Sequence, residues 1–123
     1  MKLKQQVTSL ELSKKLKELG VKQDAFWSWY EANDYDDIPR LNRSDEHCPV
    51  CTLPKQTFED KYSAFTVAEL GELLPEKVCW RGYSNYGGKW GLEFGDFRAE
   101  APSEADARAK MLIYLIENKL ITI

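Results

Sequence analysis

The first residues whose spacing could support chemistry are two cysteines in a Cys-x-x-Cys pattern, Cys48 and Cys51. Two thiolates at this spacing can share one zinc ion, which is half of the tetrahedral ligand set of a structural zinc site. The other candidate ligands are Cys79 and His47, the only histidine of the chain. Joint ligation by His47 and Cys48 would be strained because the two are adjacent. The pattern leaves three interpretations open: a zinc site, a redox pair and an unligated loop.

A second group with binding chemistry lies between residues 80 and 98, where aromatic and basic residues are interspersed with glycines. Aromatic rings can stack on a nucleobase, and Arg or Lys can hold a phosphate. The candidate residues for such a nucleotide-like ligand are Arg81, Tyr83, Tyr86, Lys89 and Arg98. We expect all of these except Tyr86 on the outward face of a sheet. The glycines match no phosphate-binding fingerprint, so a purely structural stretch is the alternative.

No catalytic set accompanies these residues. One histidine, in a predicted loop, gives no combination of nucleophile, base and orienting group. The acidic residues that lie close together in sequence fall mostly on faces that we expect to be exposed. We therefore expect a protein that is not an enzyme and that needs no cofactor, with zinc as the one exception to test.

The elements that must position these residues lie near the C-terminus. Residues 78–101 alternate between apolar and polar positions, as in strands, with turn signals at 85–88 and 95–96. Ser103 is a helix cap, and the apolar stripe that follows extends to about Leu120. The sequence predicts a three-stranded antiparallel meander that packs against this long C-terminal helix.

Another helix is predicted at residues 8–19. Thr8 and Glu11 have the spacing of a capping box, in which each side chain bonds a free backbone N–H of the first turn. Gly20 suits the left-handed position that ends a helix. Three lysines on the outer face are expected to contact solvent, with a partner-binding face as the alternative.

A further short helix is predicted at residues 66–74, where Thr66 and Glu69 form a second capping box. The aromatic run at 25–30 favours a strand, although a short helix fits its length as well. As a strand it could be the fourth of the sheet. The predicted fold is therefore α+β, with a small antiparallel sheet against two to three helices.

Residues 31–60 interrupt this pattern with a long acidic segment. The segment has three basic and eight acidic residues and little apolar periodicity. A loop of this length is uncommon in a compact domain and is often functional. We expect residues 1–123 to form a single domain, with 31–60 as a loop or insertion within it.

Composition narrows the classes of function. Hydrophobic residues make up 43% of the 123 residues, which is enough for a core, and no apolar run approaches the length of a membrane span. The formal net charge of −3 makes duplex nucleic acid an unlikely partner. An odd number of cysteines, three, and an N-terminus without a signal-peptide pattern favour a reducing, cytoplasmic location.

Three blocks of the chain resemble a family of small bacteriophage and prophage proteins. They are residues 8–23, beginning Thr-Ser-Leu-Glu-Leu; 62–75, containing Ala-Phe-Thr-Val-Ala-Glu-Leu-Gly-Glu-Leu-Leu-Pro; and 104–120, beginning Glu-Ala-Asp-Ala-Arg-Ala-Lys-Met-Leu. The resemblance implies a phage accessory protein that acts in the cytoplasm of the infected host. The Cys48–Cys51 loop lies outside the three blocks.

Two functions follow as expectations. The first is a non-catalytic accessory protein that binds a host factor or small ligand, for example a counter-defence inhibitor or a sponge for a nucleotide signal. The alternative is a structural or regulatory protein–protein interaction module, zinc-stabilised or not, without a small ligand. The expected partner is a host or phage protein or a nucleotide-like ligand, with self-association as a further option.

Overall fold

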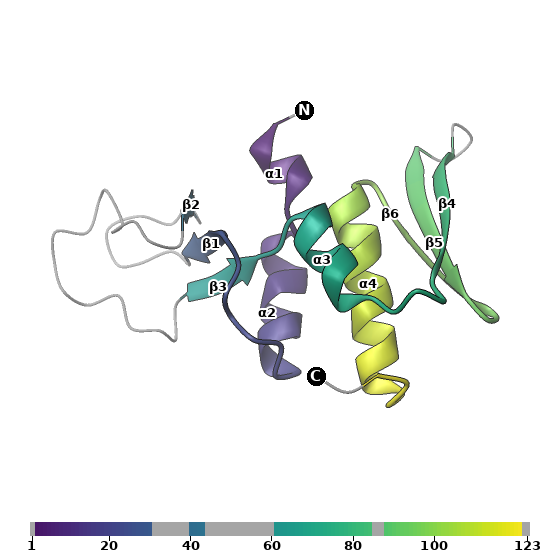
Figure 1. Cartoon of the computed structure of the whole chain (residues 1–123). Helices are drawn as coiled ribbons and strands as arrows, with labels where there is room; N and C mark the ends of the chain where they lie inside the picture. The colour runs from purple at the N-terminus through teal and green to yellow at the C-terminus, as the bar shows by residue number, and fades with distance from the viewer. Residues whose placement is uncertain (1, 31–39, 44–60, 85–87, 122–123) are drawn as a thin grey trace, which may run out of the picture.

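The last helix of the chain, α4, packs against the other helices and one of the two sheets, whereas the second sheet lies on the far side of α2 (Figure 1). The computed structural model describes residues 2–30, 40–43, 61–84 and 88–121, with the backbone alone described at 40, 42 and 79–84. The elements of this part are, in chain order, α1 (Leu3–Gln6), α2 (Leu10–Glu18), β1 (Trp27–Tyr30), β2 (Arg40–Arg43), β3 (Lys61–Ala64), α3 (Val67–Leu73), β4 (Cys79–Ser84), β5 (Lys89–Phe94), β6 (Phe97–Ala101) and α4 (Glu104–Glu117). They confirm the predicted α+β class. None of these helices is long and apolar enough to cross a membrane.

The strands belong to two separate antiparallel sheets, with the orders β2-β1-β3 and β4-β5-β6. β5 and β6 are joined by the two residues Gly95 and Asp96. Gly95 has a φ of 59°, whereas Asp96 has no positive φ. This combination is typical of a type II′ hairpin turn, in which glycine is favoured at the first position.

The aromatic run at residues 25–30 contains the strand β1, as favoured by the sequence, but this strand does not join the C-terminal sheet. β1 is instead the central strand of the other sheet, between β2 and β3. Its residues Ser28, Trp29 and Tyr30 are buried. Their backbone N–H and C=O groups therefore need partners on both sides, because unpaired buried groups are costly.

Part of the acidic segment supplies one of these partners. Residues 40–43 of the predicted loop or insertion form the strand β2, which pairs with β1 along its whole length, from Trp27 opposite Arg43 to Tyr30 opposite Arg40. The other residues of this segment lie outside the described part. The sequence did not indicate this strand, since its residues are polar or charged and show little apolar periodicity. Its pairing depends instead on the buried neighbour β1.

The first cap is shifted from its predicted position. α2 starts after Ser9, whose hydroxyl accepts a hydrogen bond from the Leu12 N–H at 3.4 Å. The predicted capping box of Thr8 and Glu11 is not formed. Thr8 is fully buried, and its hydroxyl accepts a hydrogen bond from the Phe65 N–H at 3.1 Å. The Thr8 hydroxyl therefore bonds to a residue distant in sequence and does not cap the helix as the local pattern had predicted.

The other predicted helix starts are confirmed. Thr66 and Glu69 form a capping box at α3. Ser103 caps α4 and accepts a hydrogen bond from the Asp106 N–H at 3.2 Å. Gly20, just after α2, has the left-handed φ of 90°. Helix α4 ends at Glu117, slightly before the predicted end.

Apolar contacts cover α4 on three sides, towards α2, α3 and the sheet that contains β5 and β6. Met111 and Leu115, both fully buried, pack in a core with residues of β5 and β6. Ala109 and Leu112 pack in a second core with residues of α2 and α3. The two pairs lie on different faces of the helix because its residues repeat every 3.6 positions. The fourth side of α4, between α2 and β6, carries the candidate site.

Candidate functional site

Two of the residues proposed from the sequence for ligand binding are described, and they lie far apart. Lys89 and Arg98 are both exposed. Arg98 lies opposite Glu93, four residues along β5 from Lys89. At about 3.4 Å per residue this separates them by roughly 14 Å along the strand. The side chains of Arg81 and Tyr83 and the whole of Tyr86 lie outside the described part.

Arg98 is already engaged by its own strand. Its Nε atom lies 2.7 Å from a carboxylate oxygen of Glu100. The outward positions expected for Arg81 and Tyr83 fall on side chains outside the described part. Binding of a nucleotide-like ligand by these residues therefore stays a prediction.

The proposed zinc ligands are not described well enough to test them. His47, Cys48 and Cys51 lie outside the described residues, and so does the side chain of Cys79. Within the described part, no three His, Cys, Asp or Glu residues are placed to hold a metal ion. Zinc binding by the Cys-x-x-Cys pattern therefore stays a prediction.

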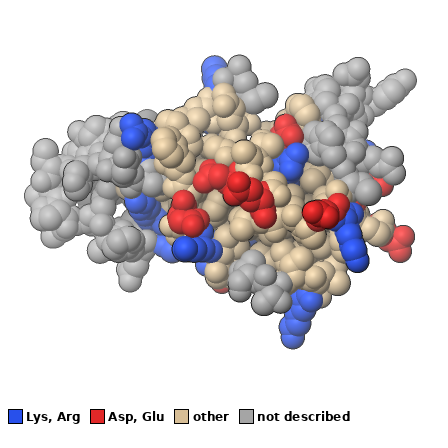
Figure 2. All heavy atoms as spheres, in the orientation of Figure 1, with Lys and Arg blue, Asp and Glu red and all other residues tan. Residues whose placement is uncertain are grey.

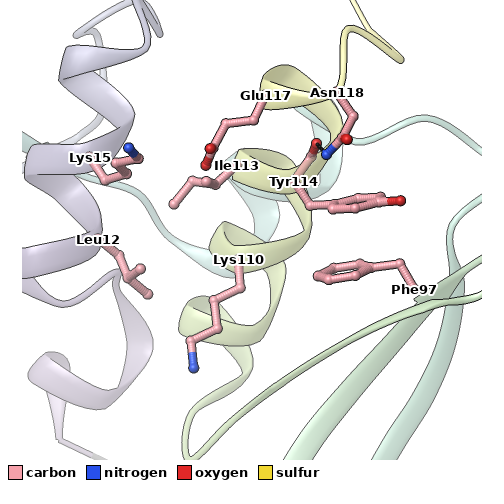
Figure 3. Close-up of a pocket in the computed structure, with 8 residues that line it drawn as sticks. All are labelled: Leu12, Lys15, Phe97, Lys110, Ile113, Tyr114, Glu117 and Asn118. Atoms are coloured by element: carbon pink, nitrogen blue, oxygen red, sulfur yellow. Dashed lines mark hydrogen bonds between the residues drawn. The ribbon is translucent and has the colours of Figure 1, made fainter.

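The structure brings together a different set of residues in a trough on the fourth side of α4 (Figure 3). The α4 trough has a volume of about 390 Å³. Its floor is the outer face of α4, and its walls come from α2 and from the start of β6. The lining residues are Leu12, Lys15, Phe97, Lys110, Ile113, Tyr114, Glu117 and Asn118.

The apolar part of the α4 trough is held in place by the surrounding packing. The rings of Phe97 and Tyr114 are stacked, with centroids 3.7 Å apart and planes within 4°. Ile113 is 9% exposed and packs in the core that α4 forms with α2 and α3. Leu12 packs against the same core from α2. The apolar surface is therefore formed by side chains whose positions are fixed before any ligand arrives.

Three charged side chains, those of Lys15, Lys110 and Glu117, lie at the rim of the α4 trough. Lys15 on α2 and Glu117 on α4 extend toward each other across one end (Figure 3). Lys110 lies farther along α4, and its Nζ atom donates a hydrogen bond to the backbone oxygen of Glu100 in β6 at 3.0 Å. The two ammonium groups and one carboxylate give the rim an excess of positive charge.

The face of the molecule in Figure 2 has a different character. Acidic side chains gather over α3 in the middle of this face, and basic side chains lie towards its periphery. Helix α3 covers α4 through contacts that include Leu70 and Leu112, whereas the α4 trough contains no α3 residue. An anionic group would therefore be repelled over α3 and attracted to the trough rim.

A partly buried hydrogen bond joins the two helices that frame the α4 trough. The Asp106 carboxylate, in the first turn of α4, accepts a hydrogen bond from the Ser9 N–H at 2.7 Å. Burial raises the pKa of Asp106 above its usual value of 3.8, against the opposing effects of the Ser9 hydrogen bonds and of Lys110. The contact holds the N-terminal ends of α2 and α4 together, so the helices run side by side in the same direction (Figure 1).

Sequence reasoning did not find the α4 trough. It assigned Lys15 to a solvated helix face and Tyr114 to the core stripe of the last helix, and both assignments are locally reasonable. The trough exists because no element of the described residues covers the strip between α2 and β6, and this depends on how the elements are arranged in three dimensions. A usable signal was the recurrence of Lys110, Ile113, Tyr114 and Glu117 on one helix face.

Comparisons with models of protein families, with curated proteins and with solved structures found no match. The functional inference for the α4 trough therefore rests on its geometry and on the chemistry of its lining residues.

Proposed function

We propose that this protein is a non-catalytic accessory protein that binds a partner in the α4 trough. The observation that supports this proposal is the trough itself, with a volume of about 390 Å³. Ligand sites typically enclose about 300 to 1,000 Å³ and combine an apolar lining with a few polar groups. The stacked Phe97 and Tyr114 rings and the flanking lysines match this description.

The dimensions favour a short segment of a partner protein or a small amphipathic molecule. From Lys110 to Asn118 the floor is about 12 Å long, at 1.5 Å per helical residue. A ligand of this length would bury its apolar part on Phe97, Ile113 and Tyr114. Its polar part would carry a carboxylate or phosphate for Lys15 and Lys110, because these ammonium groups outnumber the single acid at the rim.

The resemblance to small phage proteins supports the proposal that this binding takes place during phage infection. The three resembling blocks fall on α2, α3 and α4, the helices that build and support the trough. A phage accessory protein with such a site would bind a host factor, and counter-defence by inhibition is the activity that we propose for it. A nucleotide sponge is a weaker proposal, because Lys89 and Arg98 are separated along the sheet.

The test fills the α4 trough from an exposed position. Random peptides of about ten residues, the length of a long strand, are selected on the immobilised wild-type protein and then measured against Glu117→Trp. The indole should occupy the trough and weaken binding by about tenfold or more, which corresponds to ~1.4 kcal/mol. The control is Lys22→Trp, since the side chain of Lys22 is 86% exposed and lies outside the trough.

Binding lost in Glu117→Trp and kept in Lys22→Trp would support the proposal. Failure to enrich any peptide on the wild-type protein would overturn it. So would peptides that bind both tryptophan variants equally well, because they would occupy a different surface.

A further inference from the structure

β6 is an edge strand in the described structure, and the turn before it fixes which of its backbone groups face away from the sheet. The residues that flank a two-residue hairpin turn form a hydrogen-bonded pair, and the pairs alternate from there along the ladder. In β6, Ala99 and Ala101 therefore bond to β5. The N–H and C=O groups of Arg98 and Glu100 point away from β5, towards the open edge.

One contact supports this assignment. The outward oxygen of Glu100 accepts the hydrogen bond from the Nζ atom of Lys110, a residue that lines the α4 trough. In the described part of the chain, no group accepts a hydrogen bond from the outward N–H groups of Arg98 and Glu100. The edge of β6 therefore presents backbone donors next to the trough. Lysine at such an edge also protects the free protein against unwanted strand pairing.

Among the described residues, no strand occupies the position beside β6. Neighbouring strands lie about 4.8 Å apart, so three strands cover roughly 14 Å. Two helices side by side span about 20 Å. The shortfall lies over the strip between α2 and β6, where Leu12 and Ile113 line the α4 trough. The run at residues 25–30, which could have been a fourth strand, belongs to the other sheet.

We propose that the partner binds as an extended peptide segment that adds to β6 as a fourth strand over the α4 trough. This inference rests on the proposed function and specifies how the partner is held. Backbone hydrogen bonds to Arg98 and Glu100 supply affinity, as in other cases of strand addition. Alternate side chains of the peptide face the trough, because side chains along a strand point to opposite sides.

The trough determines the sequence of this segment. Apolar side chains face the stacked rings of Phe97 and Tyr114. When the peptide N–H takes over the Glu100 oxygen, the Lys110 ammonium is released and can pair with an acidic side chain of the peptide. The preferred partner is therefore an extended segment that combines apolar residues with Asp or Glu at the trough-facing positions.

Glu100→Pro tests the strand addition. Proline removes the outward N–H of residue 100 but no hydrogen bond to β5, and edge strands tolerate it. Glu100→Thr is the matched control, since it loses the same carboxylate and keeps the N–H. The probe is the tightest peptide selected on the wild-type protein from the random library. We expect Glu100→Pro to weaken its binding about tenfold or more, and Glu100→Thr to bind within about twofold of the wild type.

Circular dichroism and thermal unfolding must show that Glu100→Pro is folded. If it is not, the same test is made by methylating the probe peptide at successive backbone nitrogens and measuring its binding to the wild-type protein. Methylation at alternate positions should then weaken binding.

Equal binding to the proline and threonine variants, or no sensitivity to backbone methylation, would overturn strand addition and leave the proposed trough binding intact. A dimer in sedimentation that Glu100→Pro dissociates would assign the edge to a second copy of this chain and overturn the partner segment.

Discussion

At the scale of single residues, Thr8 joins three elements through its backbone and its hydroxyl. Its hydroxyl lies 2.7 Å from the Ser13 hydroxyl and accepts a hydrogen bond from the Phe65 N–H. Its carbonyl oxygen accepts a hydrogen bond from the Trp29 Nε1 atom at 2.7 Å. Because Thr8 is fully buried, water cannot replace any of these partners, and each bond contributes to the position of α2 against β1 and β3.

Thr8→Val should lower the free energy of unfolding by about 1–3 kcal/mol, because it leaves the buried Phe65 N–H without its acceptor. Thr8→Ser keeps the hydroxyl and loses one methyl group, so its cost should be about 1 kcal/mol. Urea denaturation of both variants measures the difference. A valine variant as stable as the serine variant would show that the hydroxyl does not hold these elements together.

Asp106 gives the stability a predicted dependence on pH. Burial raises its pKa in the folded state above the usual value of 3.8. The folded state therefore binds this proton more tightly than the unfolded state does, and the resulting stabilisation is present at low pH and lost as pH rises through the folded-state pKa. Asp106→Asn keeps an oxygen for the Ser9 N–H and removes the titration.

The stability of Asp106→Asn relative to wild type should therefore increase from about pH 3 to pH 7. Chemical denaturation of both proteins across this range measures the difference, and contributions from other titrating groups cancel in it. A flat difference, or one that falls with pH, would contradict the assigned cause of the shift.

At the scale of elements, helix starts were predictable where the cap serves only its own helix. Ser103 and the pair of Thr66 and Glu69 bond to N–H groups three residues away or fewer, so the local sequence contains the whole interaction. Thr8 was assigned wrongly because its partner Phe65 is 57 residues away. This assignment was wrong because local and tertiary hydrogen bonds compete for the same side chain, and residue spacing alone does not show which of them forms.

The C-terminal end of α4 offers a test of backbone conformation. Lys119 has a left-handed φ of 56°. The N–H of Lys119 bonds the Ile116 oxygen, and the N–H of Leu120 bonds the Leu115 oxygen, which is the Schellman pattern that favours glycine. Lys119→Gly should raise the free energy of unfolding by about 0.5–1 kcal/mol, because glycine adopts this conformation without strain. Lys119→Ala, which keeps the strain, should give no such gain in thermal or urea unfolding.

At the scale of the whole molecule, the sequence predicted strands but not their partition into two sheets. The alternation in residues 78–101 predicted three strands, and β4, β5 and β6 lie in this range. The sheet to which β1 belongs is decided by its burial between β2 and β3. β2 is difficult to predict because it has four residues, two of them arginines, in an acidic segment. Periodicity contains no information on such pairings.

The α4 trough was unpredictable for the same reason. Lys15, Lys110 and Tyr114 are ordinary residues of amphipathic helices when they are viewed along the chain. They form a candidate site because α2, α4 and β6 meet there, and none of the described strands covers them. The sequence was informative on the position of the helices and on the class of the fold, whereas the site follows from what the assembled elements leave uncovered.

Amide hydrogen exchange of β6, followed by NMR, tests this account most directly. In the free protein the amides of Arg98 and Glu100 should exchange fast, and those of Ala99 and Ala101 should be protected by their bonds to β5. Saturation with the selected peptide should slow the exchange of Arg98 and Glu100 and leave the two alanines protected. The account would be contradicted if Arg98 and Glu100 were already protected in the free protein, or if the bound peptide left their exchange unchanged.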